Sequence, residues 1–326
     1  MKHHFIINPA AGKGTFITSL SARIREAAEK TGIDYEIYIT TAPGDAQRFV
    51  ETALAGDSDR HRFYACGGDG TLCEVVNGAP ECPRAEFAVV PIGTGNDFCR
   101  NFSDRGAFLD IDRQIAGTPM TIDLIKYNNR YCVNMLNIGF DCHVVERTVK
   151  FKKSKLIPSS MAYTTGVVAT LLHKMHTKMH IELADGEVIE RPLLLMSIAN
   201  GQFYGGGYHS NPRANLSDRL FDVNIIEKVS RATFLSLIGS YKAGTHLETA
   251  AKYITYRQDT AIALHFDEET AVCADGELET ATDLTVTLVP SAASFVLPQG
   301  VFCITDPALA GESGDKVTEE GTYVAL

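Results

Sequence analysis

Residues 67–71, with the sequence Gly-Gly-Asp-Gly-Thr, are the first candidates for chemistry in this chain. They follow the apolar residues 63–66 and precede the largely apolar residues 72–76, an order that predicts a strand, a glycine turn and a helix. Glycine lets the backbone approach an anion closely, and the N–H groups at the start of a helix attract negative charge. A phosphate group is therefore expected at this turn.

A second glycine turn follows one strand later. The apolar residues 87–90 run into residues 91–97, which read Pro-Ile-Gly-Thr-Gly-Asn-Asp. Ligands of open α/β sheets gather at the carboxyl ends of the strands. Two such turns in succession predict a nucleotide site.

Three aspartates, Asp69, Asp97 and Asp123, lie at or just beyond the ends of predicted strands. If the fold brings them together, they repel one another unless a cation or a water network holds them, which predicts a Mg²⁺ site. Phosphoryl transfer uses such an ion to neutralise phosphate oxygens, with a base near the attacking hydroxyl. The alternative is structural, with Asp69 and Asp97 capping helices.

Residues 275–277, Asp-Gly-Glu, follow the apolar residues 271–274. A carboxylate near a substrate hydroxyl accepts its proton as the bond to phosphorus forms, and burial or nearby acids raise its pKa toward a useful range. Asp275 and Glu277 are both candidates for this base, and the residues alone do not rank them. An ordinary hairpin turn is the alternative.

Strand-like and helix-like segments alternate over residues 1–122, as expected of a doubly wound α/β sheet. Over residues 123–297 apolar side chains recur with a period of two, which predicts a mainly β, sandwich-like second domain. Two helical stretches interrupt it, at residues 161–174 and 231–242. The remaining segment, residues 298–326, ends in a polar tail and could complete the first domain.

The composition is that of a globular protein, with 326 residues, 45% of them hydrophobic and 21% charged. No apolar run is long enough for a bilayer span and the first residues lack a secretory signal, so we expect a cytoplasmic protein. Eight scattered cysteines without a CxxC pair predict reduced thiols. The net charge of −10 argues against nucleic acid as a partner.

One local basic cluster could still contact phospholipid headgroups at the inner membrane surface. A solvated loop is the alternative. Exposed strands in the second domain could also pair across a two-fold axis, which leaves a homodimer open. The cluster consists of Arg147, Lys150, Lys152, Lys153 and Lys155 beside Phe151, Leu156 and Ile157.

Common phosphate-binding and zinc-binding motifs are absent from the chain. Residues 8–14 read Asn-Pro-Ala-Ala-Gly-Lys-Gly, but Gly14 stands where a Walker A loop has Ser or Thr. No GxGxxG follows the first strand. The ten histidines show no HExxH or HxH pattern, so no zinc is expected. The nucleotide site therefore belongs to another class of fold.

Six segments, in matching order, resemble the diacylglycerol kinase catalytic-domain family of lipid kinases, and most closely its bacterial soluble members. NAD kinases share the Gly-Gly-Asp-Gly-Thr turn, whereas Gly-Thr-Gly-Asn-Asp-Phe and the late Asp-Gly-Glu make the lipid-kinase resemblance more specific. The segments are residues 8–14, 67–78, 91–101, 121–124, 201–223 and 274–277.

The resemblance implies an ATP site along the glycine turns, an acceptor-lipid cleft between the domains, and γ-phosphoryl transfer to a hydroxyl. It favours Glu277 as the base, with Asp275 in a positioning or metal-binding role. The residues implied to contact the nucleotide are Asn8, Pro9, Ala10, Ala11, Gly12, Thr40, Gly67, Gly68, Asp69, Gly70, Thr71, Leu72, Cys73, Thr94 and Asn96.

Two departures from the family pattern stand out. Cys73 occupies a position where the family commonly has asparagine, so only backbone contacts are expected there. The family also implies a structural Mg²⁺ at Asn215, Asp218 and Leu220, but Arg219 replaces a usual glycine, and a plain turn is the alternative.

The leading hypothesis is an ATP- and Mg²⁺-dependent lipid kinase that phosphorylates diacylglycerol or a related lipid alcohol at the membrane surface. Two alternatives stay open: an NAD kinase-like enzyme, and a nucleotide- or lipid-binding protein of the same fold without catalysis.

Overall fold

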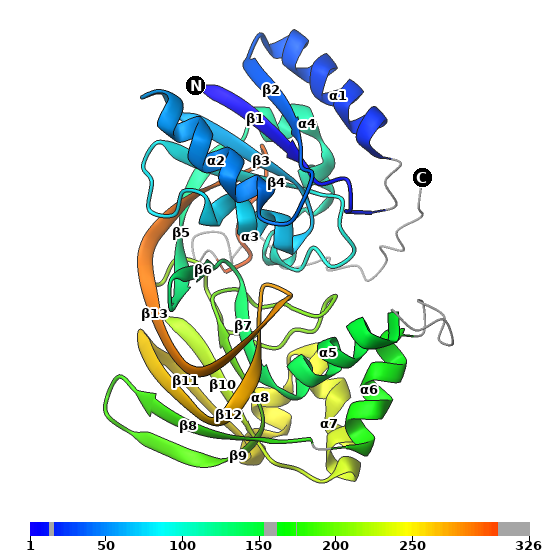
Figure 1. The fold of residues 1–326 in the computed structure, drawn as a ribbon, viewed down its shortest axis with the longest axis vertical. Helices are drawn as coiled ribbons and strands as arrows, with labels where there is room; N and C mark the ends of the chain where they lie inside the picture. The colour runs from blue at the N-terminus through cyan, green and yellow to red at the C-terminus, as the bar shows by residue number, and fades with distance from the viewer. Residues whose placement is uncertain (13–15, 153–161, 174, 306–326) are drawn as a thin grey trace.

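A parallel four-stranded sheet forms the centre of the N-terminal part of the protein (Figure 1). The computed structural model describes residues 1–12, 16–152, 162–173 and 175–305. Strand β1 lies between β2 and β3, and β4 follows β3. Every residue of β3 and β4 is buried, as expected for parallel strands covered on both faces. The strands are β1 (Lys2–Ile7), β2 (Asp34–Ile39), β3 (His61–Gly67) and β4 (Ala85–Pro91).

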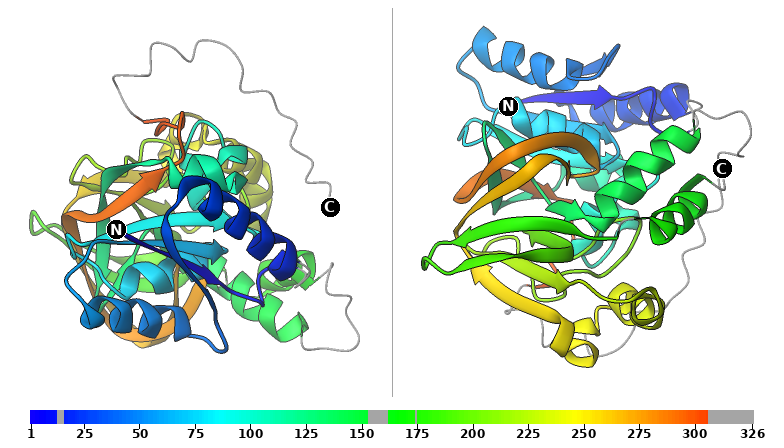
Figure 2. Two further views of the ribbon diagram at one scale, coloured as in Figure 1. Left: turned by 90° about the horizontal axis from the view of Figure 1, so that it is seen from above. Right: turned by 60° about the horizontal axis from the view of Figure 1, so that its bottom comes forward.

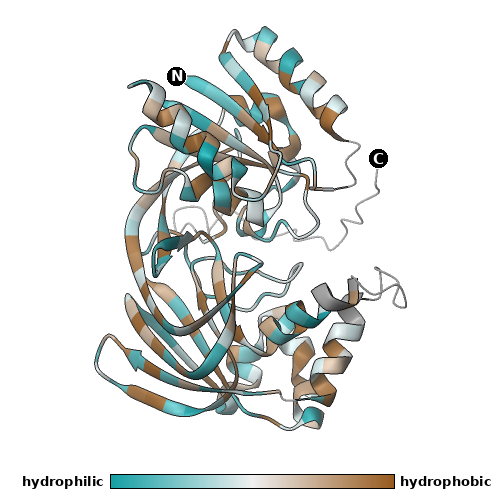
Figure 3. Cartoon of the chain, in the orientation of Figure 1, coloured by the Kyte–Doolittle hydropathy of each residue, from teal (hydrophilic) through white to brown (hydrophobic). Residues whose placement is uncertain are grey.

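Helices cover both faces of this sheet, because successive strand residues point to opposite sides. Phe5 and Ile7 pack with Leu20 of α1, whereas Ile6 packs with Val50 of α2. Figure 2 shows α1 and α2 on opposite sides of the strands, and Figure 3 shows α1 alternating between teal and brown. The helices are α1 (Phe16–Thr31), α2 (Asp45–Gly56), α3 (Asp69–Asn77) and α4 (Ile111–Ile115).

Two long strands connect this sheet with the C-terminal part. β13 (Glu277–Leu297) pairs in parallel with β4 near its end, and antiparallel with β5 (Thr118–Tyr127) along most of its length. In Figure 1 β13 curves from the lower lobe into the upper one. The predicted boundary at residue 122 therefore falls inside β5, and the last residues of β13 lie in the sheet of the first domain.

The second domain is mainly β, as its period-two pattern predicts. Its strands form a curved, sandwich-like structure around a core that includes Ile138, Met196 and Val272. The predicted helices at residues 161–174 and 231–242 correspond to α6 and α7, although residues 161 and 174 lie outside the described residues. The strands are β6 (Arg130–Cys132), β7 (Met135–Gly139), β8 (Thr177–Leu183), β9 (Val188–Ala199), β10 (Phe221–Glu227), β11 (Ile254–Asp259) and β12 (Ala261–Ala274).

Helices pack against one side of these strands. Helix α5 was not expected. The sequence predicted either a lipid-contacting cluster or a solvated loop for this basic stretch. The structure has a helix there, with Phe140 and Val144 on its buried side. Of the predicted cluster, Lys153, Lys155, Leu156 and Ile157 lie outside the described residues. The helices are α5 (Phe140–Lys152), α6 (Ala162–Leu172), α7 (Arg231–Ala243) and α8 (His246–Thr249).

Residues 298–305 return to the first domain. The backbone N–H of Gln299 donates to Arg113, and that of Ile304 donates to Asn101. Residues 306–326, the rest of the predicted tail, lie outside the described residues. Across the described ranges, the helices are too short or too polar to cross a bilayer.

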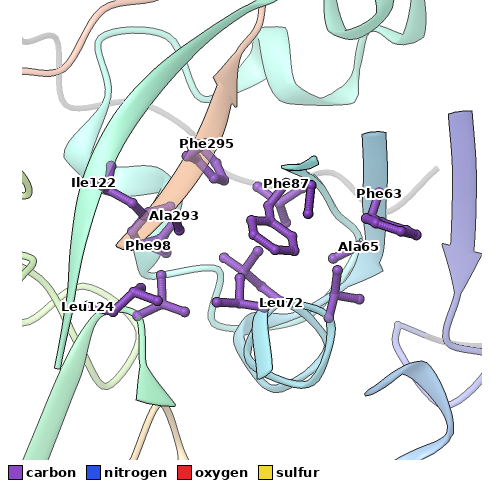
Figure 4. Close-up of a cluster of buried hydrophobic side chains, with 14 of the residues drawn as sticks. Phe63, Ala65, Leu72, Phe87, Phe98, Ile122, Leu124, Ala293 and Phe295 are labelled. Carbon is purple, nitrogen blue, oxygen red and sulfur yellow. The ribbon is translucent and has the colours of Figure 1, made fainter. Parts of the chain in front are cut away.

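Phe295, near the end of β13, anchors the core that joins the two parts (Figure 4). It is fully buried, with its ring centroid 4.9 Å from that of Phe98 and 5.5 Å from that of Phe102. We expect Phe295→Ala to lower the free energy of unfolding by about 3–5 kcal/mol, since it removes a large ring from a packed core. Urea denaturation measures this change. Leu172→Ala, at a side chain 70% exposed, is the matched control and should shift stability by less than about 0.5 kcal/mol.

Buried His3 should make stability depend on pH. Its Nδ1 lies 2.9 Å from the Tyr64 hydroxyl, and burial, helped by the Arg62 charge, lowers its pKa from 6.5 to about 4. The unfolded chain therefore takes up the proton first, so stability present above pH 6.5 is lost as the pH falls toward 4. His3→Phe should remove about 3 kcal/mol of this loss. Urea titrations across this pH range measure it, and an unchanged pH slope would contradict the prediction.

Candidate functional site

The two glycine turns lie against each other at the carboxyl ends of β3 and β4. A Cβ added to Gly93 would lie 2.5 Å from the Cα of Gly68, so the contact requires glycine. Asn96, with φ of 51°, donates from Nδ2 to the carbonyl of Gly93 at 2.8 Å and so holds the second turn. The structure therefore brings together the two phosphate-binding turns that the sequence predicts.

The loop after β1 is tied to the first of these turns. The Nδ2 of Asn8 donates to Oγ1 of Thr71 at 3.0 Å, and its Oδ1 accepts from the backbone N–H of Ala10 at 2.9 Å. Thr71 lies in the first turn of α3, which begins at Asp69 with Gly68 as its N-cap. The positive end of α3 therefore lies beside the β1 loop, where an anion is stabilised.

A cleft of about 600 Å³ runs along these turns. That volume is within the range of small-molecule and cofactor sites. Beyond the predicted residues it includes Thr41, Glu74 and Gly95. The predicted residues that border it are Asn8, Pro9, Ala10, Ala11, Gly12, Thr40, Gly68, Asp69, Gly70, Thr71, Thr94, Asp275 and Glu277.

Four predicted nucleotide contacts do not border the cleft: Gly67, Leu72, Cys73 and Asn96. Leu72 and Cys73 are buried in the core, and the Cys73 thiol donates to the Tyr131 carbonyl at 3.6 Å. Gly67 ends β3, where a Cβ would lie 2.2 Å from Oγ1 of Thr71. Leu72 and Cys73 face the core and not the cleft, because a helix directs only part of its first turn toward a ligand.

Asp69 and Asp97 both lie beside Gly95. A Cβ at Gly95 would lie 3.0 Å from an Asp69 oxygen and 3.6 Å from an Asp97 oxygen. The Asp69 carboxylate accepts the backbone N–H groups of Asp97 and Phe98, each at 3.1 Å. Burial, and secondly the negative charge of Asp97, raise the pKa of Asp69 to about 6. A cation bound here would relieve that repulsion.

Asp97 also connects the two domains. One of its oxygens accepts from Nε of Arg100 at 3.0 Å, and the other accepts from the backbone N–H of Gly206 at 2.8 Å. Gly205, Gly206 and Gly207 all have positive φ, which explains the glycine triplet. The triplet therefore forms a lip of the second domain, held by Asp97 beside the candidate carboxylates.

Asp275 is held in a nest of donors. Its carboxylate accepts the backbone N–H groups of Val133, Asn134 and Met135 at 2.7, 2.9 and 3.1 Å, and the Cys132 thiol at 3.0 Å. These donors occupy the lone pairs of the carboxylate. This arrangement suits a positioning role better than proton transfer.

Glu277 extends from the second domain over the first glycine turn. A Cβ added to Gly70 would lie 3.4 Å from its Oε1. Its other oxygen lies 3.2 Å from Nη2 of Arg130, which also pairs with Glu279. The Glu277 side chain is 38% exposed, so one carboxylate oxygen is available at the cleft.

Asp123 does not join this cluster, contrary to the expectation that three strand-end aspartates meet. It lies within β5, and its oxygens accept the backbone N–H groups of Arg219 and Ser291, both at 2.7 Å. Residues 215–220 thus wrap around Asp123, with Arg219 at a φ of 68°.

The predicted structural-metal loop therefore lies around Asp123. Asp218 accepts from the backbone N–H of Leu220 at 3.1 Å, while Asn215 accepts from that of Ser217. Burial raises the pKa of Asp218, and the Asp123 charge adds to this. A metal role for these residues stays a prediction.

The side chains at the cleft fit a Mg²⁺ ion that is held partly by nucleotide phosphates better than one held by protein ligands alone. Within the described ranges, three or more His, Cys, Asp or Glu side chains nowhere gather in a metal-binding group. Mg²⁺ in nucleotide enzymes is commonly held by one or two carboxylates together with phosphates and water. Asp69 and Asp97 supply such oxygens next to the phosphate turns.

Sequence reasoning missed three polar residues near the site. Arg130 pairs with Glu277 across 147 positions, and Asp141 at the start of α5 lies below the lip formed by the glycine triplet. Neither has a sequence signal, because contacts between segments that are distant in the chain leave no spacing pattern. Glu74 is a third, since it lines the cleft while capping α2 through the backbone N–H of Gly44.

Comparison with known proteins identifies both halves of the chain. Residues 2–127 match the profile of the diacylglycerol kinase catalytic domain, and residues 134–297 match that of the YegS C-terminal NAD kinase beta sandwich-like domain. These matches confirm the predicted α/β domain and sandwich-like second domain.

Individual proteins that are similar to this chain point to the same family. The chain is 30% identical over 274 residues to a diacylglycerol kinase of Staphylococcus carnosus, covering 83% of this chain and 87% of the relative. It is 29% identical over 276 residues to one of Bacillus subtilis, covering 83% and 88%. A crystal structure of a diacylglycerol kinase from Bacillus anthracis superposes with a TM-score of 0.67 at 20% identity, covering 91% of this chain and 97% of that one, and supports the fold.

Proposed function

Because the chain belongs to the diacylglycerol kinase family, we propose that it is an ATP- and Mg²⁺-dependent lipid kinase. It transfers the γ-phosphoryl group of ATP to the hydroxyl of diacylglycerol or a related lipid alcohol presented at a membrane surface. Family membership supports lipid phosphorylation at the family level. We propose ATP as the phosphoryl donor, Mg²⁺ as the metal ion, and diacylglycerol or a related lipid alcohol as the acceptor.

The observation that carries this proposal is the position of Glu277 over Gly70. It places a half-exposed carboxylate of the second domain directly above the turn expected to hold the phosphates. A hydroxyl that enters between the domains would then meet a proton acceptor and the terminal phosphate together. Holding both reactants in one place lowers the barrier by removing the entropic cost of their encounter.

Each side chain has a distinct part in this scheme. The turns at Gly68 and Gly93 and the N-terminus of α3 bind phosphate oxygens through backbone N–H groups. Glu277 accepts the proton of the acceptor hydroxyl while the hydroxyl oxygen forms the new bond to the γ-phosphorus; the bond from that phosphorus to the β-phosphate oxygen breaks and ADP leaves. Asp275 keeps the 275–277 turn in register through its backbone donors.

Mg²⁺, when bound, neutralises charge on the phosphate oxygens in the transition state. Asp69 and Asp97, whose carboxylates lie beside Gly95, would hold it. Mutual repulsion of these carboxylates in the absence of a cation supports this assignment, because the pKa of Asp69 rises to about 6 through burial and the Asp97 charge.

Incubation of the purified protein with labelled ATP, Mg²⁺ and a panel of lipid alcohols in mixed micelles tests the proposal. We expect label in at least one lipid product, and none when Mg²⁺ is chelated. NAD without lipid is the control acceptor for an NAD kinase-like activity. Transfer to NAD alone would overturn the lipid-kinase proposal, and nucleotide binding without any transfer would identify a binding protein.

A further inference from the structure

The lip formed by the glycine triplet is a compact turn that the first domain holds at Gly206. Within the turn, the carbonyl of Tyr204 accepts the backbone N–H groups of Gly207 and Tyr208 at 3.1 and 2.8 Å. The N–H of Gly206 instead donates to Asp97 of the first domain at 2.8 Å. The lip can therefore separate from Asp97 as one unit, with its own hydrogen bonds intact.

Arg100 strengthens this contact between the domains. Its Nη2 donates to the carbonyl of Gly206 at 3.4 Å, while its Nε donates to Oδ1 of Asp97 at 3.0 Å. A Cβ added to Gly207 would lie 3.1 Å from the guanidinium carbon, so this glycine lets the lip approach Arg100 closely. Asp97, Arg100 and Gly206 thus contact one another in pairs, and we call these three contacts the latch.

The latch uses the oxygen of Asp97 that lies nearest to Asp69. A Cβ at Gly95 would lie 3.6 Å from Oδ2 of Asp97 and 3.0 Å from Oδ2 of Asp69. The N–H of Gly206 donates to that same Oδ2 of Asp97. A Mg²⁺ ion shared by the two aspartates would therefore bind beside an N–H donor and the Arg100 guanidinium. Its positive charge repels both groups and neutralises the negative charge on which both contacts depend.

We propose that metal binding at Asp69 and Asp97 opens the latch, so that the position of the lip depends on whether the ion is bound. Gly205 of the lip borders one cavity of about 120 Å³ together with Asp69, Asp97 and Asp275. While the latch is closed, the lip forms part of the wall of this cavity. Once the latch opens, the space in front of the carboxylates widens, and the acceptor enters after the nucleotide and its ion. This inference rests on the proposed Mg²⁺ site and adds to it a coupling between the domains.

Hydrogen exchange of the ADP-bound wild-type protein, resolved at single amides and measured with and without Mg²⁺, tests the opening directly. Gly206 is exposed, so its hydrogen bond to Asp97 is what protects its N–H from exchange. We expect this N–H to exchange at least about fivefold faster when Mg²⁺ is added, although ligands ordinarily slow exchange.

Two neighbouring amides are internal controls for this measurement. The N–H groups of Gly207 and Tyr208 donate to Tyr204, which moves with the lip, so their exchange rates should not change. Faster exchange at all three amides would mean that the turn unfolds and does not separate as a unit. A Gly206 N–H that exchanges equally fast, or more slowly, with Mg²⁺ would overturn the proposal.

The coupling must also act in reverse, because linkage between two equilibria is reciprocal. A change that weakens the latch should therefore strengthen Mg²⁺ binding. Gly207→Ala is such a change and leaves every charge in place, since the added methyl would lie 3.1 Å from the Arg100 guanidinium. Gly205→Ala is the matched control: this glycine also has positive φ, but the nearest atom to the added methyl belongs to Tyr208, at 3.5 Å.

Calorimetric titration of the ADP-saturated protein with Mg²⁺, corrected for the titration of ADP alone, measures this effect. We expect the dissociation constant for Mg²⁺ to fall at least about threefold in Gly207→Ala and to stay within about twofold of wild type in Gly205→Ala. Equal constants in Gly207→Ala and wild type would contradict the coupling. Should Gly207→Ala not fold, the exchange rates of the wild-type protein decide the question alone.

The outcomes separate this inference from the proposed function. If Mg²⁺ binds to the ADP-bound protein and the exchange of the Gly206 N–H does not accelerate, the metal site stands and the coupling is wrong. If calorimetry detects no Mg²⁺ binding in the presence of ADP, the proposed metal dependence itself fails, and the coupling fails with it. Transfer of label to a lipid in the micelle assay supports the lipid-kinase function in either case.

Discussion

Glu277→Gln is expected to lower the turnover number for the lipid acceptor by about 10²–10⁴-fold, the range for loss of a general base. Glutamine keeps the size of the side chain and can still lie over Gly70, but it cannot take up the hydroxyl proton. The KM for ATP should stay within about twofold, because the phosphate turns are built from other residues. Steady-state kinetics with labelled ATP, together with a nucleotide-binding titration, measures both quantities.

Glu279→Gln is the matched control for this variant. Glu279 lies two positions further along β13, pairs with the same Arg130, and has a similarly exposed side chain, 35% against 38%. Unlike Glu277, it does not border the cleft. We expect Glu279→Gln to change turnover less than about threefold. Equal losses in the two variants would show that Arg130 pairing, and not proton transfer, accounts for the effect, and retained activity in Glu277→Gln would remove Glu277 from the role of base.

Much of the fold could be predicted because its elements depend on local patterns. The glycine turns, the parallel strands and the period-two strands all follow from residues close together in the chain. Helix α5 was missed because its basic residues dominate the sequence, while its buried side, with Phe140 and Val144, is defined by packing on distant strands. The domain boundary is blurred for the same reason, since β13 belongs to both sheets.

The site shows the same division. The residues that line the cleft through their backbones were predictable, because glycine turns are recognisable in the sequence. The hydrogen bonds that each carboxylate accepts were not predictable from the sequence. Asp275 is saturated by donors that lie 140 or more positions away, and Asp123 is turned to the loop at Arg219 and not to Asp69. Such assignments depend on which oxygens remain free after folding, a property that only the three-dimensional arrangement defines.

Asp69→Asn should give the second large loss, about 10³-fold or more in kcat/KM for ATP, with Mg²⁺ dependence as its signature. The substitution removes one of the two carboxylates proposed to share the ion with the phosphates, and electrostatic stabilisation of the transferred group is the main source of rate in this chemistry. A Mg²⁺ titration of kcat/KM should show a higher half-saturating concentration in the variant. Metal-free ADP binding should change little, since backbone N–H groups supply most of its contacts.

Stability must be separated from metal binding in this variant, because Asp69 accepts two backbone N–H groups. Asparagine offers one acceptor oxygen, so one donor loses its partner at a cost of about 1–3 kcal/mol, while removal of a buried charge that Asp97 repels offsets part of that cost. The net change in the free energy of unfolding should therefore be small, and ADP should still raise the unfolding temperature. The variant should lose the further increase in unfolding temperature that Mg²⁺ gives in the presence of ADP. If Asp69→Asn keeps that increase, and its half-saturating Mg²⁺ concentration equals that of the wild type, the ion is held elsewhere. Asp69 then serves to position the second turn through Asp97 and Phe98.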